Sequence, residues 1–527
     1  MKLLSKHIHN CHRNLLIYIS ILLFSIIALP IYAGEWRVVP GLHINERYTD
    51  NFRLGGGIAG SKGNDEFITQ LNPSILINGN ARRYRVDVNY LMNNLIYANH
   101  SEFNRVRHQL NALGTVELIK DRFFIDGRAM IMQQNASLIG AQGLDNANSF
   151  NRRDVNILNV SPYYRHRFGD FATAELRYTH GEVSTSGGGL STSGGGLRDS
   201  STDNGTVRLN SSTAFRNLQW GLTYNHTEIH RSQLRAIELE RSTLLLRYML
   251  TPQFSVVGTG GYERNSFISI NGATSSPTWT VGFSWIPNER TEFDFAGGRR
   301  IFGDTYLANF SHRTRLTTWN LSYNEDITTF GQQNLLQPGA AGAIPSGGIL
   351  PQLLLNTLTN AGMGGGGLAN QGALFGILGA NNFFTNRLFL QRSLQAFMAV
   401  NGSRNTVVFR GFNISRQAYT GDEEDDSIGG RANSVLNRST VQTGGGVSWI
   451  YRLSPLVNLT TNYTFTRINF TTTNLTDINQ IMMVSLNKQF SPNLSGGINY
   501  FHNRRDSERL NGDFSSNNYM ASLSMNF

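Results

Sequence analysis

The sequence has little cysteine, little charge and almost no long apolar run. A single cysteine, Cys11, stands in 527 residues, which excludes a disulfide framework and a thiolate metal cluster within one chain. Charged residues make up only 16%, against roughly 25% in ordinary soluble proteins. After the N-terminal region, no stretch reaches the 18 or so apolar residues of a membrane-spanning helix. What is abundant is glycine, at 54 residues, and aromatic residues, at 11%. This composition indicates a large all-β protein.

Residues 1–33 differ from the rest of the chain. Lys2, Lys6 and Arg13 precede an apolar run over 15–29, and small Ala33 follows it. This layout is typical of a secretory signal peptide, with cleavage expected after Ala33. An uncleaved anchor helix is the alternative, because Ile31 stands where a small residue is usual. The expected mature chain is 34–527.

The net charge of +10 raises the question of nucleic-acid binding. Beyond residue 33, lysine occurs only at Lys62, Lys120 and Lys488, so the basic residues are nearly all arginine. These arginines are spread along the whole chain and form no patch. We therefore expect no nucleic-acid partner.

Strict alternation of polar and apolar residues recurs along the chain. In 83–90, Arg83, Arg85 and Asp87 alternate with Tyr84 and Val86. Short turns join many such runs at one end, and long polar loops join them at the other, as in outer-membrane barrels. The pattern predicts a transmembrane antiparallel up-and-down β-barrel of about 18–22 strands. Candidate strands begin near residues 38, 65, 83, 108, 122, 154, 171, 203, 217, 239, 253, 277, 290, 305, 315, 386, 404, 437, 456, 476, 493 and 515.

Alternation alone does not separate a membrane barrel from a soluble sandwich. The barrel is favoured because aromatic residues gather at strand ends, for example Trp279 and Trp285, and because the repeat continues for most of the chain without a linker. The final segment, 515–527, supports it. Its apolar face resembles the C-terminal signal that the barrel assembly machinery reads, and it includes Tyr519, Leu523, Met525 and Phe527.

If the apolar face meets lipid, the polar face lines a lumen. The candidate lumen-lining residues are Arg83, Arg85, Asp87, Arg165, Arg167, Glu175, Arg177, Arg241, Arg247, Glu292 and Asp294. Because an arginine at the lipid midplane costs about 2–4 kcal/mol, this orientation is strongly favoured. The lining suits hydroxylated or acidic sugar chains. The alternative is a ladder of cross-strand arginine–carboxylate pairs that only solvates the interior.

Three segments interrupt the strand pattern. The apolar, Gly-rich segment 330–386 is expected to fold into or over the barrel mouth as a constriction or lid, or else to serve as an interaction loop. The duplicated STSGGGL at 184–197 indicates an expanded flexible loop. The acidic run 422–426 is interpreted either as a solvated charge run or as a divalent cation site near lipopolysaccharide, although it lacks the ligand spacing of a calcium loop.

The sequence carries no recognisable catalytic signature. It has no HExxH, GxSxG or Walker motif, and His226 and His230 have no third ligand nearby in the sequence. We expect no enzyme, no cofactor and no metal, and an outer-membrane lipid hydrolase is the less favoured alternative. A TonB-dependent transporter is not expected either, because the first strand follows Ala33 within a few residues and leaves no room for a plug domain.

Several soft motifs resemble one family. Val39-Pro40-Gly41-Leu42, the stretch 48–54, Leu71-Asn72-Pro73 and Ser161-Pro162-Tyr163-Tyr164 are similar to segments of the PEP-CTERM system-associated outer-membrane proteins. The resemblance covers essentially the mature chain and involves no catalytic residue. It implies a Gram-negative outer-membrane barrel associated with exosortase and exopolysaccharide loci.

The sequence thus predicts a porin-like outer-membrane barrel that is a conduit for exopolysaccharide export. Expected partners are outer-membrane lipid and lipopolysaccharide, the barrel assembly machinery, polysaccharide and periplasmic export proteins. A closed structural or surface-binding barrel without transport is the alternative.

Overall fold

The computed structural model describes residues 34–54, 65–138, 151–186, 199–270, 273–335, 384–425, 435–509 and 512–527. The expected signal peptide, the interior of segment 330–386, most of the tandem repeat and the last acidic residue of 422–426 lie outside the described residues.

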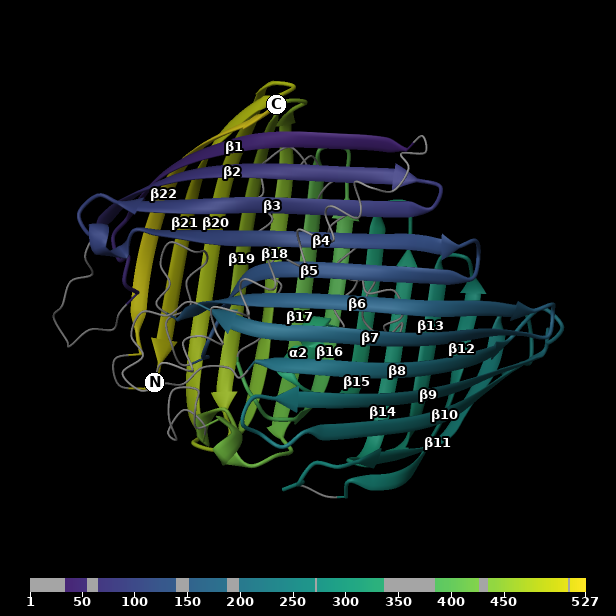
Figure 1. Cartoon of the computed structure of the whole chain (residues 1–527). Helices are drawn as coiled ribbons and strands as arrows, with labels where there is room; N and C mark the ends of the chain where they lie inside the picture. The colour runs from purple at the N-terminus through teal and green to yellow at the C-terminus, as the bar shows by residue number, and fades with distance from the viewer. Residues whose placement is uncertain are drawn as a thin grey trace, which may run out of the picture.

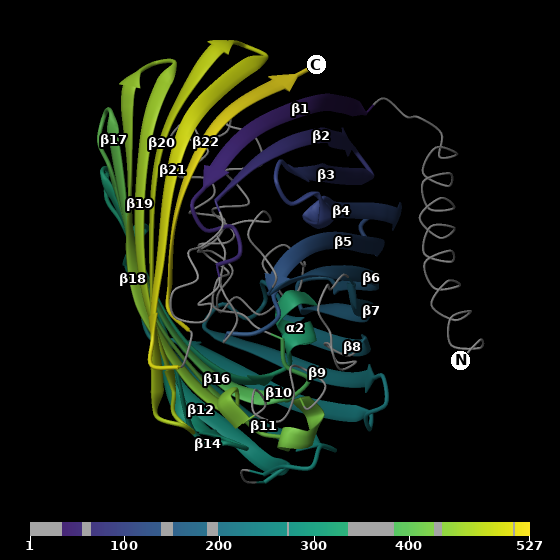
Figure 2. The ribbon, with the colours of Figure 1, turned by 90° about the vertical axis from the view of Figure 1, so that its left-hand side faces the viewer.

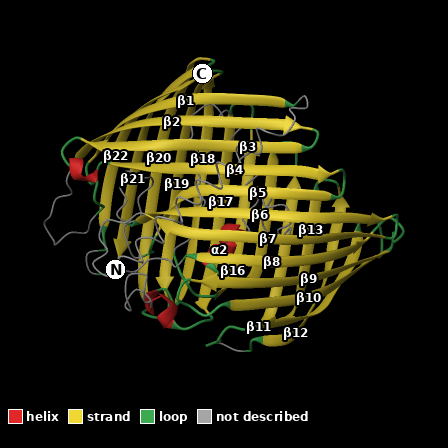
Figure 3. Cartoon of the chain, viewed as in Figure 1, coloured by secondary structure: helices red, strands yellow, loops and turns green. Residues whose placement is uncertain are grey.

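The alternating runs of the sequence form long antiparallel strands, drawn in Figure 1. Their bounds are β1 (Glu35–Thr49), β2 (Glu66–Ala81), β3 (Tyr84–Tyr97), β4 (Arg105–Ile119), β5 (Phe123–Asn135), β6 (Arg152–Phe168), β7 (Ala172–Ser186), β8 (Ser200–Ser211), β9 (Leu218–Arg231), β10 (Ile237–Met249), β11 (Phe254–Asn265), β12 (Ser275–Asn288), β13 (Thr291–Arg300), β14 (Gly303–Arg313), β15 (Thr317–Thr328), β16 (Phe389–Asn401), β17 (Asn405–Ala418), β18 (Ser439–Ser454), β19 (Val457–Phe470), β20 (Leu475–Ser491), β21 (Leu494–Ser507) and β22 (Phe514–Asn526). Helical pieces in the described residues are short: η1 (Ser101–Phe103), α2 (Phe330–Leu335) and η3 (Asp422–Asp425) (Figure 3).

Each strand pairs with its sequence neighbours, and β1 pairs with β22, so the 22-stranded sheet closes on itself. Tyr48 of β1 lies opposite Tyr519 of β22 in this closing seam. In Figure 1 the strands of the front wall cross those of the back wall at a steep angle, as the tilt of a closed barrel requires. The predicted fold class is confirmed, at the upper limit of the predicted strand number.

The outer face of the barrel is apolar. Leu244, Val281 and Ile498 are 44%, 58% and 69% exposed on this face. Ser284 of β12 and Asn499 of β21, which point inward, are buried. Comparable exposed apolar residues follow on nearly every strand. A closed sheet with an apolar band of this extent is stable only when hydrocarbon covers it, and closure leaves no strand edge unpaired in that hydrocarbon. The chain is therefore a transmembrane β-barrel.

Aromatic residues mark both limits of the apolar band. On β12, Trp279 and Trp285 are both exposed on the outer face. Beyond the band, polar contacts such as that between His180 Nδ1 and Asp203 Oδ1, at 2.8 Å, and ion pairs such as Arg504–Asp506, at 3.0 Å, stand on the outer face. This change from apolar to charged side chains is that of a strand leaving the bilayer core for the headgroup region.

The C-terminal strand β22 is a full member of the sheet between β21 and β1. Its Tyr519, Leu523 and Met525 are exposed on the outer face, and Phe527 follows directly after the strand with its side chain exposed. These residues form the apolar face that the sequence indicated. Their recognition by the assembly machinery stays a prediction.

The two ends of the barrel differ. Both chain ends of the sheet, Glu35 and Asn526, lie at the end where short turns join the strands, called here the short-turn end. The opposite, long-loop end carries nearly all the longer connections; the tight connection between β13 and β14 is an exception. An even strand number with this asymmetry is the architecture of Gram-negative outer-membrane barrels. No helix within the described residues is long and apolar enough to cross a membrane.

Candidate functional site

The inner wall brings three of the predicted lumen residues together. Arg165 on β6 and Glu175 and Arg177 on β7 all project inward. Arg165 Nη2 lies 3.0 Å from Glu175 Oε2, and Arg177 Nε lies 3.2 Å from Glu175 Oε1. Arg177 Nη1 also donates to Asp126 Oδ2 at 2.8 Å. The Arg177 side chain is only 8% exposed, so here the arginines are cross-strand ion-pair partners, as the ladder interpretation proposes.

Aromatic rings complete this cluster. The guanidinium carbon of Arg177 lies 3.8 Å from the ring centroid of Tyr163, within cation–π range. Phe124 stacks on Tyr163 with its ring centroid 5.0 Å away. Sequence reasoning did not identify Asp126, Tyr163 or Phe124 as members of a site. The pairing of strands β5, β6 and β7 brings them together, and a single sequence does not reveal that register.

Other predicted residues lie apart from this cluster, near the short-turn end. Arg83 lies in the turn before β3. Arg85 and Asp87 form their own pair, with 3.1 Å between Nε and Oδ2. Arg167 pairs with Asp170 of the following turn at 3.3 Å, and both side chains are more than half exposed.

Arg241 belongs to a second ionic cluster on a different part of the wall. Its Nε lies 3.2 Å from Oε1 of Glu263 on β11. The same oxygen accepts a hydrogen bond from Arg300 Nε on β13 at 2.8 Å. Arg300 Nη2 lies 2.9 Å from Asp326 Oδ1 on β15. This chain of pairs joins strands β10 to β15 across the wall.

The remaining predicted residues are more isolated. Glu292 and Asp294 on β13 lie opposite Ser311 and Asn309 of β14. Arg247 lines a cleft of about 800 Å³ between the short-turn ends of β8, β9 and β10. The wall thus presents separate charged clusters and not one continuous basic surface.

At the long-loop end, the described ends of the connection between β15 and β16 contact the opposite wall of the barrel. Phe330 of α2 and Phe384 pack together, with ring centroids 5.1 Å apart, against Val155 on β6 and Val183 on β7. The backbone N–H of Phe384 donates to the carbonyl of Ala136, after β5. Figure 2 shows α2 inside the barrel, between the walls formed by β5–β9 and β16–β18. The described ends of segment 330–386 therefore lie in the lumen.

A second contact between walls is ionic. Arg231 Nη1, at the end of β9, lies 2.8 Å from Glu424 Oε2 in η3, and the same nitrogen donates to the carbonyl of Asn386. Arg387 Nε lies 3.2 Å from Asp425 Oδ2. The Asp425 side chain, only 2% exposed, also accepts hydrogen bonds from the Thr385 hydroxyl at 2.8 Å and the Asn386 backbone N–H at 2.6 Å.

This arrangement corrects both interpretations of the acidic run at Glu424 and Asp425. Neither side chain is a solvated surface charge or a free cation ligand, because two arginines distant in the sequence bind them. Among the described residues, no group of three or more His, Cys, Asp or Glu side chains could hold a metal ion. Burial raises the pKa of Asp425 to about 6, against the opposing effect of the Arg387 guanidinium.

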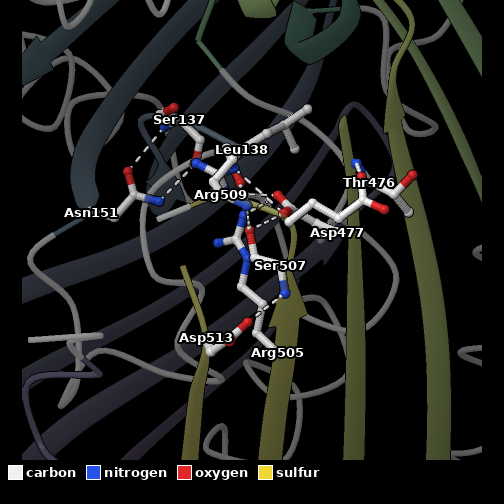
Figure 4. A network of polar contacts seen from close by, with 10 residues as sticks. Ser137, Leu138, Asn151, Thr476, Asp477, Arg505, Ser507, Arg509 and Asp513 are labelled. Carbon is white, nitrogen blue, oxygen red and sulfur yellow. Dashed lines mark hydrogen bonds and ion pairs between the residues drawn. The ribbon is translucent and has the colours of Figure 1, made fainter. Parts of the chain in front are cut away.

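A third contact joins the loop after β5 to β20 and β21, and Figure 4 shows its members Leu138, Asp477, Arg505 and Arg509. Asp477 on β20 accepts from Arg505 Nη2 at 2.5 Å and from Arg509 Nη2 at 2.6 Å, and the Ser507 hydroxyl is a further donor to it. Arg505 Nη2 also donates to the carbonyl of Leu138 at 2.8 Å.

The Leu138 side chain, fully buried, packs against Ile468 and Phe470 of β19. The loop that follows β5 is thereby held on the far wall. Together with the Phe330 and Arg231 contacts, this network links strands that are distant around the ring at the long-loop end. We call these three contacts the mouth ties.

One histidine on the inner wall is positioned between two serines. His43 Nδ1 lies 2.9 Å from Ser524 Oγ, and Nε2 lies 3.0 Å from Ser74 Oγ. In serine hydrolases a histidine activates the nucleophilic serine, and a carboxylate or amide group orients the imidazole. Here a second hydroxyl occupies that place, so His43 serves the polar packing of β1, β2 and β22.

Comparison with known proteins gives similarity in architecture only. No family model matches the chain, and no curated protein matches its sequence. Among solved structures, the siderophore receptor PirA from Pseudomonas aeruginosa is 10% identical, with 93% of this chain and 80% of that chain covered and a TM-score of 0.44. The FrpB iron transporter from Neisseria meningitidis is 11% identical, with 93% and 82% covered and a TM-score of 0.49. Similarity of this degree assigns no ligand and no reaction to this chain.

Proposed function

We propose that this chain is an outer-membrane conduit for a hydrophilic polymer, closed at rest by its mouth ties, and that the polymer is an exopolysaccharide. The observation that carries the proposal is the construction of the mouth. A 22-stranded barrel is wide enough to need an internal closure. Here ion pairs and small apolar clusters between opposite walls supply a closure, and such contacts can break and form again without unfolding the strands.

The inner wall supports a polar, hydroxylated cargo. It offers arginines, carboxylates and amides from many strands, and planar guanidinium groups suit carboxylate and hydroxyl oxygens. The resemblance of stretches such as Val39-Pro40-Gly41-Leu42 to exosortase-associated outer-membrane proteins favours an exopolysaccharide among such polymers. Delivery at the short-turn end then falls to periplasmic export proteins, and release takes place at the long-loop end, outside the cell.

Single-channel recording in planar lipid bilayers tests the conduit. We expect the intact barrel to be mostly closed, with brief openings, and Arg231→Ala to lengthen them because it releases both Glu424 and Asn386. The matched control is Arg264→Ala, whose side chain is 67% exposed on the neighbouring outer face and ties no walls together. A barrel that passes no current even after Arg231→Ala is a sealed structural or surface-binding barrel.

That second candidate has a specific observation in its favour. The pairs Arg387–Asp425 and Arg505–Asp477 are almost wholly removed from solvent, with side chains 0–2% exposed. A barrel that never opens needs nothing more than such fixed contacts. The current measurement separates the two candidates directly.

A further inference from the structure

The inner wall is divided by charge. On β3 to β7 the inward face carries arginines and carboxylates, such as Arg85, Arg177 and Asp126. On β19 to β22 the inward face carries no charge between the Asp477–Arg505 pair at the long-loop end and the short turns. We call this second surface the amide wall.

Asparagines dominate the amide wall. Asn462, Asn479, Asn499, Asn503 and Asn518 come from four successive strands, and each is no more than 6% exposed. Serine and threonine fill many of the positions between them. Amides and hydroxyls both donate and accept hydrogen bonds, so the inward faces of these four strands offer mixed donors and acceptors and no charge of their own between the Asp477–Arg505 pair and the short turns.

Several of these polar atoms have no hydrogen-bond partner among the residues that the structure describes. Neither the amide oxygen nor the amide nitrogen of Asn479 has one, and the same holds for Asn499 Oδ1, Asn462 Nδ2 and Ser485 Oγ. All four side chains are more than nine-tenths buried. In a solvated lumen such groups pair with water, and a hydroxyl-rich ligand can take the place of that water.

An apolar patch lies within the amide wall. Met483, Phe501 and Met520 pack together on the inward faces of β20, β21 and β22. Arg47 of neighbouring β1 borders this patch: its Nη2 donates to Met520 Sδ at 3.6 Å, and its guanidinium carbon lies 5.9 Å from the ring centroid of Phe501. Ser485 and Asn499, which face each other across β20 and β21, directly adjoin it. Alternation of apolar C–H surface with donors and acceptors is also the surface pattern of a sugar ring, and aromatic and thioether groups pack well on apolar surface.

We propose that the amide wall binds an uncharged, hydroxyl-rich glycan chain, so that the cargo of the conduit is a neutral polysaccharide. This inference rests on the proposed function and names its substrate class. An anionic glycan would instead favour the arginine-bearing wall, because an uncharged amide forms much weaker hydrogen bonds with a carboxylate than a guanidinium does. A conduit must also let the chain advance from one sugar unit to the next. Every unit carries hydroxyl groups, so each can form the same hydrogen bonds in turn.

The test measures binding to the full-length processed barrel in detergent by saturation-transfer NMR titration, with neutral dextran oligosaccharides and acidic oligogalacturonate as probes. We expect dextran to bind more tightly than oligogalacturonate. The double variant Asn479→Leu/Asn499→Leu should weaken dextran binding about ten-fold, the effect of losing one to two net hydrogen bonds. Asn111→Leu/Asn309→Leu, which changes two inward asparagines outside the amide wall, should leave it unchanged. If the double variant fails to fold, Ser485→Ala replaces it.

The same titration is made on Glu424→Gln, in which the Arg231 tie is weakened, so that a closed mouth is not the reason for an absence of binding. Tighter binding of oligogalacturonate than of dextran would overturn the inference, as would undiminished dextran binding by the amide-wall variant. Absence of dextran binding in both the wild type and Glu424→Gln would also overturn it. A barrel that conducts ions but fails these tests keeps its conduit role, whereas a sealed barrel that binds dextran loses the conduit role and keeps the binding surface.

Discussion

The Asp477 network makes a quantitative prediction about how firmly the long-loop end is closed. Asp477→Asn keeps the size of the side chain and one acceptor oxygen but removes the charge. Arg505, 1% exposed, would then be a buried guanidinium without its carboxylate. Breaking a buried pair on one side costs about 3–5 kcal/mol, and we expect the lower value because Arg505 keeps its hydrogen bond to the Leu138 carbonyl.

Hydrogen–deuterium exchange measures this locally. If the network opens as a unit, a loss of about 3 kcal/mol raises the exchange rate about 100-fold. The increase should be confined to 136–138 and 505–509, which the network joins, and the central strands should keep their protection. In bilayers, the same variant should open more often than the wild type.

Asp506→Asn is the matched control. Asp506 is next to Arg505 but lies on the outer face, where it pairs with Arg504 at 3.0 Å, with 43% and 57% of the two side chains exposed. Exposed pairs contribute about 0–1 kcal/mol, so exchange should change little. Equal exchange in Asp477→Asn and the wild type, or equal acceleration in both variants, would show that the network does not hold the walls together.

The fold could be predicted from the sequence because the bilayer imposes a simple rule. Each strand must present apolar residues to lipid at every second position, so alternation over about ten residues gives both the element and its orientation. The first strand begins at Glu35 and the last at Phe514, close to the predicted starts near 38 and 515. Arg177 likewise projects inward, as its place in the alternation indicated.

The partners of these residues could not be predicted. Arg177 binds Asp126 because β5, β6 and β7 pair in a particular register, which one sequence does not specify. Glu424 and Asp425 form part of an acidic run that resembles a solvated loop, and their arginines come from the end of β9 and from just before β16. Contacts between opposite walls depend on the cross-section of the closed barrel, and no local pattern encodes that shape.

Three further outcomes test the orientation of the strands and the chemistry of the mouth. Val281→Arg places a charge on the lipid-facing surface of β12 and should destabilise the folded barrel in urea by about 2–4 kcal/mol, whereas Thr280→Arg on the inner face should cost far less; equal costs would contradict the assigned faces. Glu424→Gln should speed protease cleavage near η3, because Arg231 loses its carboxylate, and unchanged cleavage would show that this tie holds nothing. The last outcome concerns pH. The pKa of Asp425 is raised from 3.8 to about 6, so the folded state binds this proton more tightly than the unfolded state does. The resulting stability is fully present below about pH 4 and is lost as the pH rises through 6, a change of up to about 3 kcal/mol. Urea unfolding at pH 4.5 and pH 7.5 should show the wild type losing stability relative to Asp425→Asn as the pH rises; a constant difference between the two, or one of opposite sign, would mean that Arg387 outweighs burial at this carboxyl group.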